Sequence, residues 1–333
     1  MTNDHESAGY DIIGDIHGCA DQLEALLAAM GYRRSGSSGA YRHPSRTAIF
    51  VGDLIDRGKQ QLRVLEIVKA MVDAGTARMV LGNHEFNALA YATESPDRPG
   101  KYLRPHDDPT NTRSEKNEDQ HRAFLDQVAG ETRAKYLEWF WTQPLWLDLG
   151  ELRVVHACWH QESIDLLERE LGGDRLRSVD DLVRASTKGD PVYHAVETLL
   201  KGPEISLVDQ NQPPFLDKGG HPREQARLRW WDGGAKTLRA LAEIDDSYTT
   251  VDGQPYPPLP EIEVAKEYRA FVYGDQVPVF YGHYWRRGTP QETRDWTGYT
   301  ACVDFSVAKD GALMAYRWSR ETRIEPGNYV AVR

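Results

Sequence analysis

Three short blocks of this sequence end an apolar run in a glycine and then carry side chains that can bind a metal ion. The blocks are DIIGDIHG, IFVGDLIDRG and MVLGNHE, and their carboxylate, imidazole and amide groups are Asp15, His17, Asp53, Asp56, Asn83 and His84. In an α/β sheet, ligands bind beyond the carboxyl ends of parallel strands. A glycine directly after each strand lets the backbone turn sharply. The three blocks therefore predict one site at one edge of a sheet.

Two later blocks add histidines in the same position relative to an apolar run. The run VVH ends at His156, and the run VFYGH ends at His283. Oxygen and nitrogen ligands without a thiolate suit divalent metals such as manganese, iron, cobalt or zinc. One such block would be an ordinary turn or a packed histidine, but five in one chain indicate a metal centre.

The apolar periodicity predicts the elements that hold these residues. The first ninety residues alternate between strands at 10–14, 47–52 and 77–81 and helices at 20–30, 62–72 and 84–92. This order predicts a parallel sheet with helices on its faces, an α/β fold. Further strands are expected at 145–149, 152–156, 277–282, 299–305 and 312–318, the last two joined as a hairpin, and helices at 120–142 and over much of 160–200.

Two stretches lack a clear pattern. Residues 94–118 are rich in proline and charged residues and are expected to form a long loop or lid. Residues from about 202 to 268 are rich in proline, glycine and aspartate and are expected to be a less regular insert. Because ligand blocks lie towards both ends of the chain, we expect residues 1–333 to form a single domain.

Composition restricts the classes of function. The net charge of −11 argues against an extended nucleic-acid footprint and against binding to an anionic membrane. The three cysteines form no CxxC pair, which predicts reduced thiols in a cytoplasmic protein. The first ten residues are polar, so no signal peptide is expected, and no apolar run is long enough to span a bilayer.

The motifs GDIHG, GDLIDRG and GNHE resemble the signature of the phosphoprotein-phosphatase branch of the calcineurin-like metallophosphoesterases. That branch includes bacterial diadenosine tetraphosphatases and the phosphatase module of bacterial polynucleotide kinase-phosphatases. The continuous likeness covers about residues 10–90, with shorter matches around 145–160 and 277–305. It implies the calcineurin-like metallophosphoesterase fold, a two-sheet β core flanked by helices. It also implies two divalent metal ions, with manganese favoured over iron, zinc, cobalt, nickel or magnesium.

The resemblance also implies the metal ligands. The first metal would be held by Asp15 and His17, and Asp53 would bridge both metals. The second metal would be held by Asn83, His156 and His283.

The same resemblance implies catalytic roles. His84 would be a general acid oriented by Asp56, and Arg57 would bind phosphate oxygens. The family also has a phosphate-binding arginine between the last two histidine blocks. Its candidates here are Arg229, which we favour, Arg227 and Arg269.

The chemistry of phosphoryl transfer supports these roles independently. Two metals lower the pKa of a bridging water, so that a metal-bridging hydroxide can attack a phosphate ester or phosphoanhydride. The planar guanidinium of Arg57 matches the edge of a phosphate group. An imidazole such as that of His84 stays protonated more readily beside a carboxylate such as that of Asp56.

The residues after His283 help to choose among branches. Many phosphodiesterase and nuclease branches carry a second metal histidine in a GHxH motif, but this chain has Trp285 there, which cannot bind a metal. We therefore expect a phosphatase acting on phosphomonoesters, phosphoproteins or nucleotides such as diadenosine polyphosphates. One alternative is a phosphodiesterase or nuclease. Another is an inactive binding module on the same fold, which predicts a lost ligand, and none of the six is missing.

Overall fold

The computed structural model describes residues 9–36, 39–217, 220–244, 247–290 and 297–333. The chain divides into two compact units, one formed by Met1–Leu200 with Gln276–Arg333 and the other by Lys201–Asp275. The first unit carries every residue of the predicted metal centre. The expectation of one inseparable domain stays a prediction, which limited proteolysis tests.

The first sheet is built on the predicted parallel strands. Strand β1 (Gly9–Ile13) pairs in parallel with β4 (Arg46–Phe50), and β4 pairs in parallel with β5 (Ala77–Met79). Helix α1 (Ala20–Ala29) follows β1, and α2 (Gln61–Asp73) follows β4. The alternation of strands and helices expected from the sequence is therefore confirmed. Helix α3 (Asn83–Ala92) follows β5, and a small hairpin of β2 (Arg33–Arg34) and β3 (Tyr41–Arg42) lies between α1 and β4.

The C-terminal strands extend this sheet on the other side of β1. Strand β16 (Ala312–Trp318) runs antiparallel to β1, with Tyr316 opposite Ile12. It also pairs antiparallel with β15 (Asp304–Phe305) and β17 (Tyr329–Val332). The predicted hairpin is thus confirmed, with a 3₁₀ turn, η2 (Val307–Lys309), in its loop and a second one, η3 (Pro326–Asn328), before β17.

A second sheet is formed by four strands. It contains, in order, β14 (Thr300–Cys302), β13 (Val279–Tyr281), β7 (Arg153–Val155) and β6 (Trp146–Asp148). Strand β13 is parallel to both β7 and β14, whereas β6 and β7 are antiparallel. The single strand expected at 299–305 is wrong in one respect, because the chain passes from the second sheet at β14 to the first sheet at β15.

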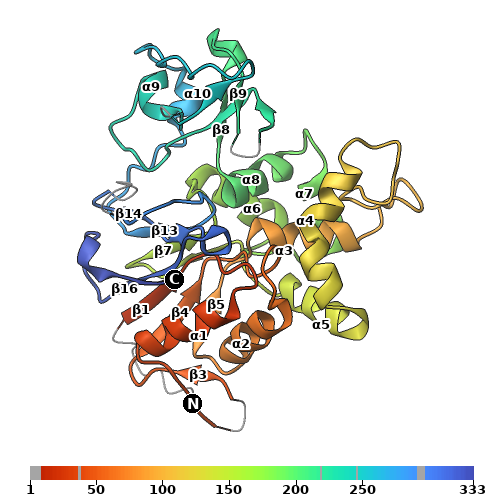
Figure 1. Ribbon diagram of the computed structural model, residues 1–333, viewed down its shortest axis with the longest axis vertical. Coiled ribbons are helices and arrows are strands. Elements are labelled where there is room, and N and C mark those ends of the chain that lie inside the picture. Colours follow the sequence, from red (N-terminus) through yellow and green to blue (C-terminus); the bar gives the residue numbers. More distant parts are fainter. Residues whose placement is uncertain (1–8, 37–38, 218–219, 245–246, 291–296) are drawn as a thin grey trace. The chain divides into compact units, whose positions relative to one another are not determined.

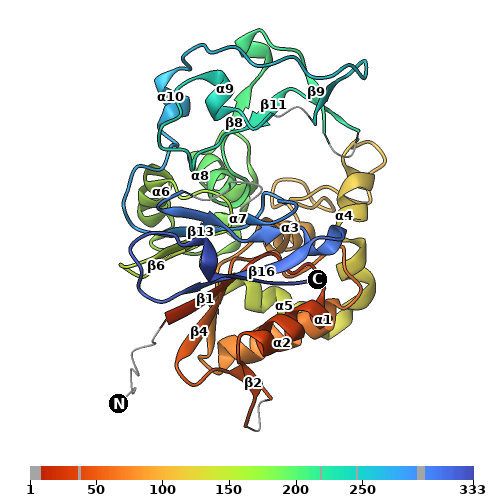
Figure 2. The same ribbon diagram turned by 60° about the vertical axis from the view of Figure 1, so that its left-hand side comes forward.

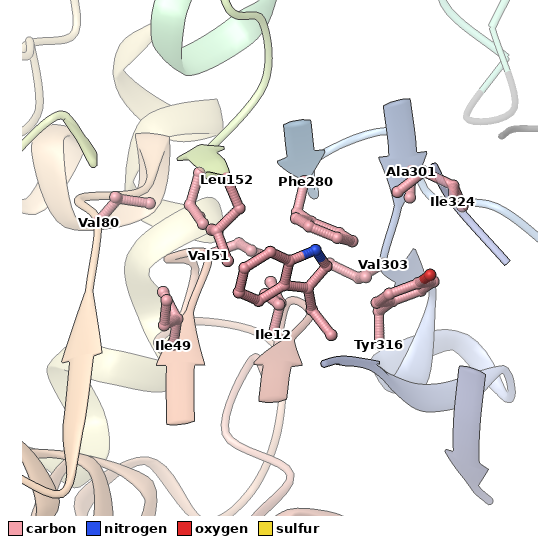
Figure 3. Close-up of a cluster of buried hydrophobic side chains, with 12 residues drawn as sticks. Ile12, Ile49, Val51, Val80, Leu152, Phe280, Ala301, Val303, Tyr316 and Ile324 are labelled. Atoms are coloured by element: carbon pink, nitrogen blue, oxygen red, sulfur yellow. The ribbon is translucent and has the colours of Figure 1, made fainter. Parts of the chain in front are cut away.

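A cluster of buried apolar side chains lies between the two sheets. Ile12, Ile49 and Tyr316 of the first sheet belong to one cluster of buried side chains with Phe280 and Ala301 of the second (Figure 3). Burying these side chains stabilises the contact between the sheets, because removing apolar surface from water contributes about 25 cal/mol per Å². The two-sheet core implied by the resemblance is therefore confirmed.

Helices cover the outer faces of the sheets. Figures 1 and 2 show α1 and α2 beside the first sheet, on the side away from the second. Helix α1 buries Leu23, Leu26 and Leu27, which share one face at helical spacing. The expected helical region after residue 160 contains α6 (Gln161–Leu171), α7 (Val179–Ser186) and α8 (Pro191–Lys201).

The helix expected at 120–142 is two helices. Helix α4 (Ser114–Gln127) begins inside the stretch expected to be a loop, and α5 (Gly130–Trp141) follows it. Between them the backbone becomes extended at Val128, and Gly130 has a φ of +56°, which favours glycine. The buried face of α4 includes the polar side chains of Asn117 and His121, so apolar periodicity alone did not reveal its start.

The second unit contains short elements around its own core. Two small sheets are present, one of β8 (Glu204–Ser206) and β11 (Gln225–Arg227), and one of β10 (Pro222–Arg223), β9 (Phe215–Leu216) and β12 (Thr249–Thr250). Its helices are η1 (Val208–Gln210), α9 (Leu238–Leu241) and α10 (Lys266–Arg269). Elements this short leave little periodicity in the sequence. No helix in the part of the chain that the structure describes is long and apolar enough to cross a membrane.

Candidate metal centre

The predicted ligands meet at the carboxyl ends of strands from both sheets. Strands β1, β4 and β5 lead to the first three blocks, and β7 and β13 lead to the two later histidines. All the ligands are less than a tenth exposed: Asp15, His17, Asp53, Asn83, His156 and His283. The structure therefore brings together every metal ligand that the sequence predicts.

Asp53 lies at the centre of this cluster. Its Oδ2 is 3.6 Å from Nε2 of His17, and its Oδ1 is 3.4 Å from Nε2 of His156. Asp53 Oδ2 and His17 Nε2 are buried without a hydrogen-bond partner among the residues that the structure describes. Buried polar atoms normally have partners, and a carboxylate oxygen facing an imidazole nitrogen suits a divalent metal. The residues present therefore fit a metal centre on both sides of Asp53.

Asn83 lies beside the second group of predicted ligands. Its Oδ1 lies 3.0 Å from Nε2 of His156 and 2.8 Å from Nδ1 of His283. Asp53, His156 and His283 offer ligand atoms within 4.8 Å of one another. An amide oxygen among these nitrogens completes an oxygen and nitrogen donor set.

Backbone carbonyls fix the orientation of two of the imidazoles. Nδ1 of His17 donates to the carbonyl oxygen of Ile55 at 2.7 Å, and Nδ1 of His156 donates to that of Val51, also at 2.7 Å. With the proton on Nδ1, each ring presents the lone pair of Nε2 to the centre. His283 differs, because its Nδ1 faces Asn83, so it would bind a metal through that nitrogen.

The charges of the buried carboxylates also suit a cation. Burial, together with Asp304 and Asp53, raises the pKa of Asp15 well above its ordinary value. Burial also raises the pKa of Asp53, but His156 and His84 outweigh it and hold that pKa well below the ordinary value. A bound divalent cation would favour the ionised form of both groups.

Several residues of the centre have left-handed backbone conformations that are uncommon outside glycine. The φ angles are +45° at His17, +51° at Asp53 and +72° at His283. Each such residue costs about 1–3 kcal/mol, so the surrounding structure must hold it in place. Asp56 and Arg57, at +70° and +69°, extend the strained segment that begins at Asp53.

Glu85 helps to hold this segment, a role that the sequence pattern did not indicate. Its carboxylate accepts hydrogen bonds from the backbone N–H of Asp53 and Leu54, both at 2.8 Å, and of Gly82 at 3.1 Å. Burial and the nearby charge of Asp53 raise the pKa of Glu85 to about 7. The GNHE block therefore supplies a support for the Asp53 loop as well as a predicted ligand.

The glycines of the blocks have two different roles. Gly52 has a φ of +96° and makes the sharp turn that the sequence predicts. Gly82 is needed because the backbone of Asp53 lies close to it: a Cβ there would lie 2.3 Å from the backbone nitrogen of Asp53. The same holds at Gly282, where a Cβ would lie 2.0 Å from Oδ1 of Asp15.

The proposed acid and its partner lie beside the ligands. Nδ1 of His84 is 2.5 Å from Oδ2 of Asp56, and both side chains are buried. Nε2 of His84 lies 3.8 Å from Oδ2 of Asp53 and 3.4 Å from a guanidinium nitrogen of Arg57. His84 also falls within a possible metal-binding group with His17 and Asp53. Its role as acid and not ligand stays a prediction.

The guanidinium of Arg57 lies against an aromatic side chain, that of Trp285, for which the sequence pattern indicated no role in the site. The guanidinium carbon of Arg57 lies 3.5 Å from the centre of the Trp285 ring, and the Lys309 amine lies 4.1 Å from the same ring. The backbone N–H of Trp285 donates to the buried carboxylate of Asp304 at 2.6 Å. At the position where other branches carry the second histidine of GHxH, this chain therefore has a side chain that contacts Arg57 and Lys309.

The stretch expected to be a loop contributes an arginine near His84. Arg104 donates to Oε1 of Gln120 at 2.6 Å, and Nε2 of Gln120 is 3.5 Å from Nε2 of His84. Nothing in the sequence pattern distinguished Arg104 from its neighbours. The favoured candidate, Arg229, belongs to the second unit, so its contact with phosphate stays a prediction.

Comparisons with known proteins identify the family of this chain. Residues 10–284 match the model of a family described as calcineurin-like phosphoesterase. The asymmetrical bis(5′-nucleosyl)-tetraphosphatase PrpE of Oceanobacillus iheyensis is 32% identical over 148 residues, 44% of this chain and 54% of that protein. The enzyme of the same name from Bacillus subtilis is 31% identical over 150 residues, 44% of this chain and 57% of that protein. The chain thus spans about half the length of these curated relatives.

A solved structure gives a further likeness. A protein serine/threonine phosphatase from Saccharomyces cerevisiae aligns with 99% of this chain and 80% of its own, at 13% identity and a TM-score of 0.47.

Proposed function

We propose, from the premise that this chain belongs to the calcineurin-like phosphoesterase family, that it is a metal-dependent phosphohydrolase. The family uses a dinuclear divalent metal centre, and the described residues include two groups of candidate ligands that share Asp53. The observation that carries the proposal is the position of Asp53, whose two carboxylate oxygens face His17 and His156 separately. A carboxylate placed in this way can serve both groups at once.

The ligand set supports manganese, with iron, zinc, cobalt, nickel and magnesium as alternatives. Two such ions, when bound, activate a water molecule and neutralise charge on the phosphate. The residues that would hold them are Asp15, His17, Asp53, Asn83, His156 and His283.

The other side chains of the centre supply binding and proton transfer. Arg57 binds oxygens of the phosphate, and Trp285 keeps its guanidinium turned towards the site. His84 donates a proton to the departing oxygen, because Asp56 holds Nδ1 and leaves the Nε2 side of the ring facing the centre. Protonation of the leaving group matters most when that group is a strong base.

The substrate that we propose is a nucleotide with a phosphoanhydride, such as a diadenosine polyphosphate. This choice rests on the names of the relatives from Oceanobacillus iheyensis and Bacillus subtilis. Phosphomonoesters and phosphoproteins are the alternatives. We place the protein in the cytoplasm because its three cysteines, Cys19, Cys158 and Cys302, are all free thiols.

The test uses the purified full chain after chelation and after return of manganese. Diadenosine tetraphosphate, p-nitrophenyl phosphate, a phosphoserine peptide and bis-p-nitrophenyl phosphate would be compared as substrates. We expect manganese-dependent hydrolysis of the first two and little of the diester. Asp53→Asn should abolish it, whereas Asp73→Asn on the exposed surface of α2 should not. Hydrolysis that is equal with and without metal, or that survives in Asp53→Asn, would refute the proposal.

A further inference from the structure

Asp56 has a second histidine partner that the proposed reaction does not explain. Its Oδ2 is 2.5 Å from Nδ1 of His84 and 3.0 Å from Nδ1 of His121. Asp56 is fully buried, and His121 is 1% exposed. The other carboxylate oxygen, Oδ1, has no hydrogen-bond partner among the described residues. One carboxylate oxygen therefore faces both imidazoles at once.

Helix α4 is anchored so that His121 reaches this carboxylate. The side chain of Gln127, near the end of α4, accepts from the backbone N–H of Gln61 at 3.0 Å and donates to the carbonyl of Gly58 at 3.1 Å. Gln61 in turn accepts the backbone N–H of Asp56 at 2.7 Å. The helix and the Asp56 loop are thus tied together on the same side of the centre.

His121 also borders a cavity whose lining includes none of the predicted metal ligands. His121 lines a cavity of about 210 Å³ with Tyr91, Tyr102 and His106, and the Tyr91 ring lies edge to face with it at 5.3 Å. In the part of the chain described by the structure, Nε2 of His121 has no hydrogen-bond partner, and the one acceptor facing Nδ1 is Oδ2 of Asp56, at 3.0 Å and off the ideal hydrogen-bond direction. Since an ionised carboxylate can only accept, a neutral His121 with its proton on Nδ1 is placed to donate to Asp56 across this 3.0 Å contact.

The charges around Asp56 agree with this arrangement. Burial raises the pKa of Asp56, but hydrogen bonds from His121 and His84 outweigh it and bring the pKa to about 2. Burial lowers the pKa of His121, with an opposing effect from Asp56 and a further lowering by Arg104. A neutral His121 thus stabilises the ionised carboxylate without adding a charge to the site.

We propose that His121 is a positioning residue, the outer member of a hydrogen-bonded chain His121–Asp56–His84. Its donor fixes the rotation of the Asp56 carboxylate, so that Oδ2 stays against Nδ1 of His84. Without this donor, a buried carboxylate with fewer partners would turn or take up a proton, and His84 would lose its orientation. The inference rests on the proposed function, because His121 affects the rate only through His84.

The test compares two substrates that need different help from the acid. Losing the hydrogen bond to the Asp56 carboxylate should change the rate about tenfold, which corresponds to about 1.4 kcal/mol. His121→Ala should therefore lower kcat about tenfold on an alkyl phosphate and less than about twofold on p-nitrophenyl phosphate, with KM unchanged. His121→Asn, which restores an N–H donor, should recover most of the loss. Phe124→Leu, on the same buried face of α4, controls for packing and should lower thermal stability without this substrate dependence.

A double-mutant cycle tests the route of the effect. In an Asp56→Asn background, His121→Ala should cause no further loss on the alkyl phosphate, because both changes act through one chain. Equal losses on the two substrates, or additive losses in the double variant, would overturn the inference.

A spectroscopic measurement separates this inference from the proposed function. The Nδ1–H proton of His84, hydrogen-bonded to Asp56, should give a low-field proton signal in NMR. That signal should shift in His121→Ala and not in Phe124→Leu. An unchanged signal would contradict the hydrogen-bonded chain His121–Asp56–His84 even if the enzyme is active. A shifted signal in a protein that hydrolyses no phosphate ester or anhydride would support the hydrogen-bonded chain His121–Asp56–His84 and would refute only the proposed function.

Discussion

Replacing Trp285 with leucine is expected to weaken phosphate binding without disturbing the metal ligands. The ring lies between two cations, 3.5 Å from the guanidinium carbon of Arg57 and 4.1 Å from the amine of Lys309. A cation–π contact contributes about 0.5–1 kcal/mol at exposed sites and about 2 kcal/mol when desolvated. Trp285 is partly buried and Arg57 lies beside the buried centre, so we expect about 1–2 kcal/mol. That corresponds to a loss of roughly five- to thirtyfold in kcat/KM.

The assay follows kcat/KM for p-nitrophenyl phosphate and inhibition by inorganic phosphate. Trp285→Leu should raise the inhibition constant for phosphate and lower kcat/KM by a similar factor. Trp285→Phe, which keeps an aromatic ring, should lower kcat/KM less. Lys309→Met serves as a matched control, because it removes the other cation and keeps the ring against Arg57. If Trp285→Leu leaves phosphate inhibition unchanged, or if Lys309→Met reproduces its loss, the positioning of Arg57 by the ring is refuted.

Three further predictions concern stability, catalysis and domain structure. In metal-free protein, the pKa of Asp56 lies at about 2 against an ordinary 3.8, so its ionised form should contribute about 2 kcal/mol above pH 4. This contribution should be lost between about pH 4 and pH 2. The unfolding free energy of Asp56→Asn should therefore fall less over that range than that of the wild type. Parallel curves of unfolding free energy against pH for the two proteins would contradict this prediction. His84→Asn should keep both metals and lose far more rate on an alkyl phosphate than on p-nitrophenyl phosphate, and loss of a metal would make His84 a ligand. Limited proteolysis should give no active N-terminal fragment of about 150 residues, because His156 and His283 lie beyond it.

The predicted ligands could be recognised in the sequence because each lies at or just after the end of a short apolar run. Each ligand block follows a strand closely, so the order of strands was enough to place Asp15, Asp53 and Asn83 at one edge. His156 and His283 could be added because each ends its own apolar run. The position of such a residue at the end of a strand can be predicted from its immediate neighbours in the sequence. The fold then brings these strand ends together.

The residues that were missed depend on contacts between distant segments. Trp285 reaches Arg57 from the other end of the chain, and no spacing rule connects them. His121 lies on a helix whose buried face is partly polar, so apolar periodicity gave no sign that it points inward. Glu85 was visible in GNHE, but its hydrogen bonds to Asp53 and Leu54 require the tertiary structure.

The bridging role of Asp53 is the claim on which the whole account depends. It is tested most directly by elemental analysis of the chain loaded with manganese, compared with Asp53→Asn treated in the same way. We predict about two manganese ions per wild-type chain, fewer than about one in the variant, and no hydrolysis of p-nitrophenyl phosphate by the variant. A variant that retains both ions and full activity, or a wild-type chain that binds none, would contradict the account.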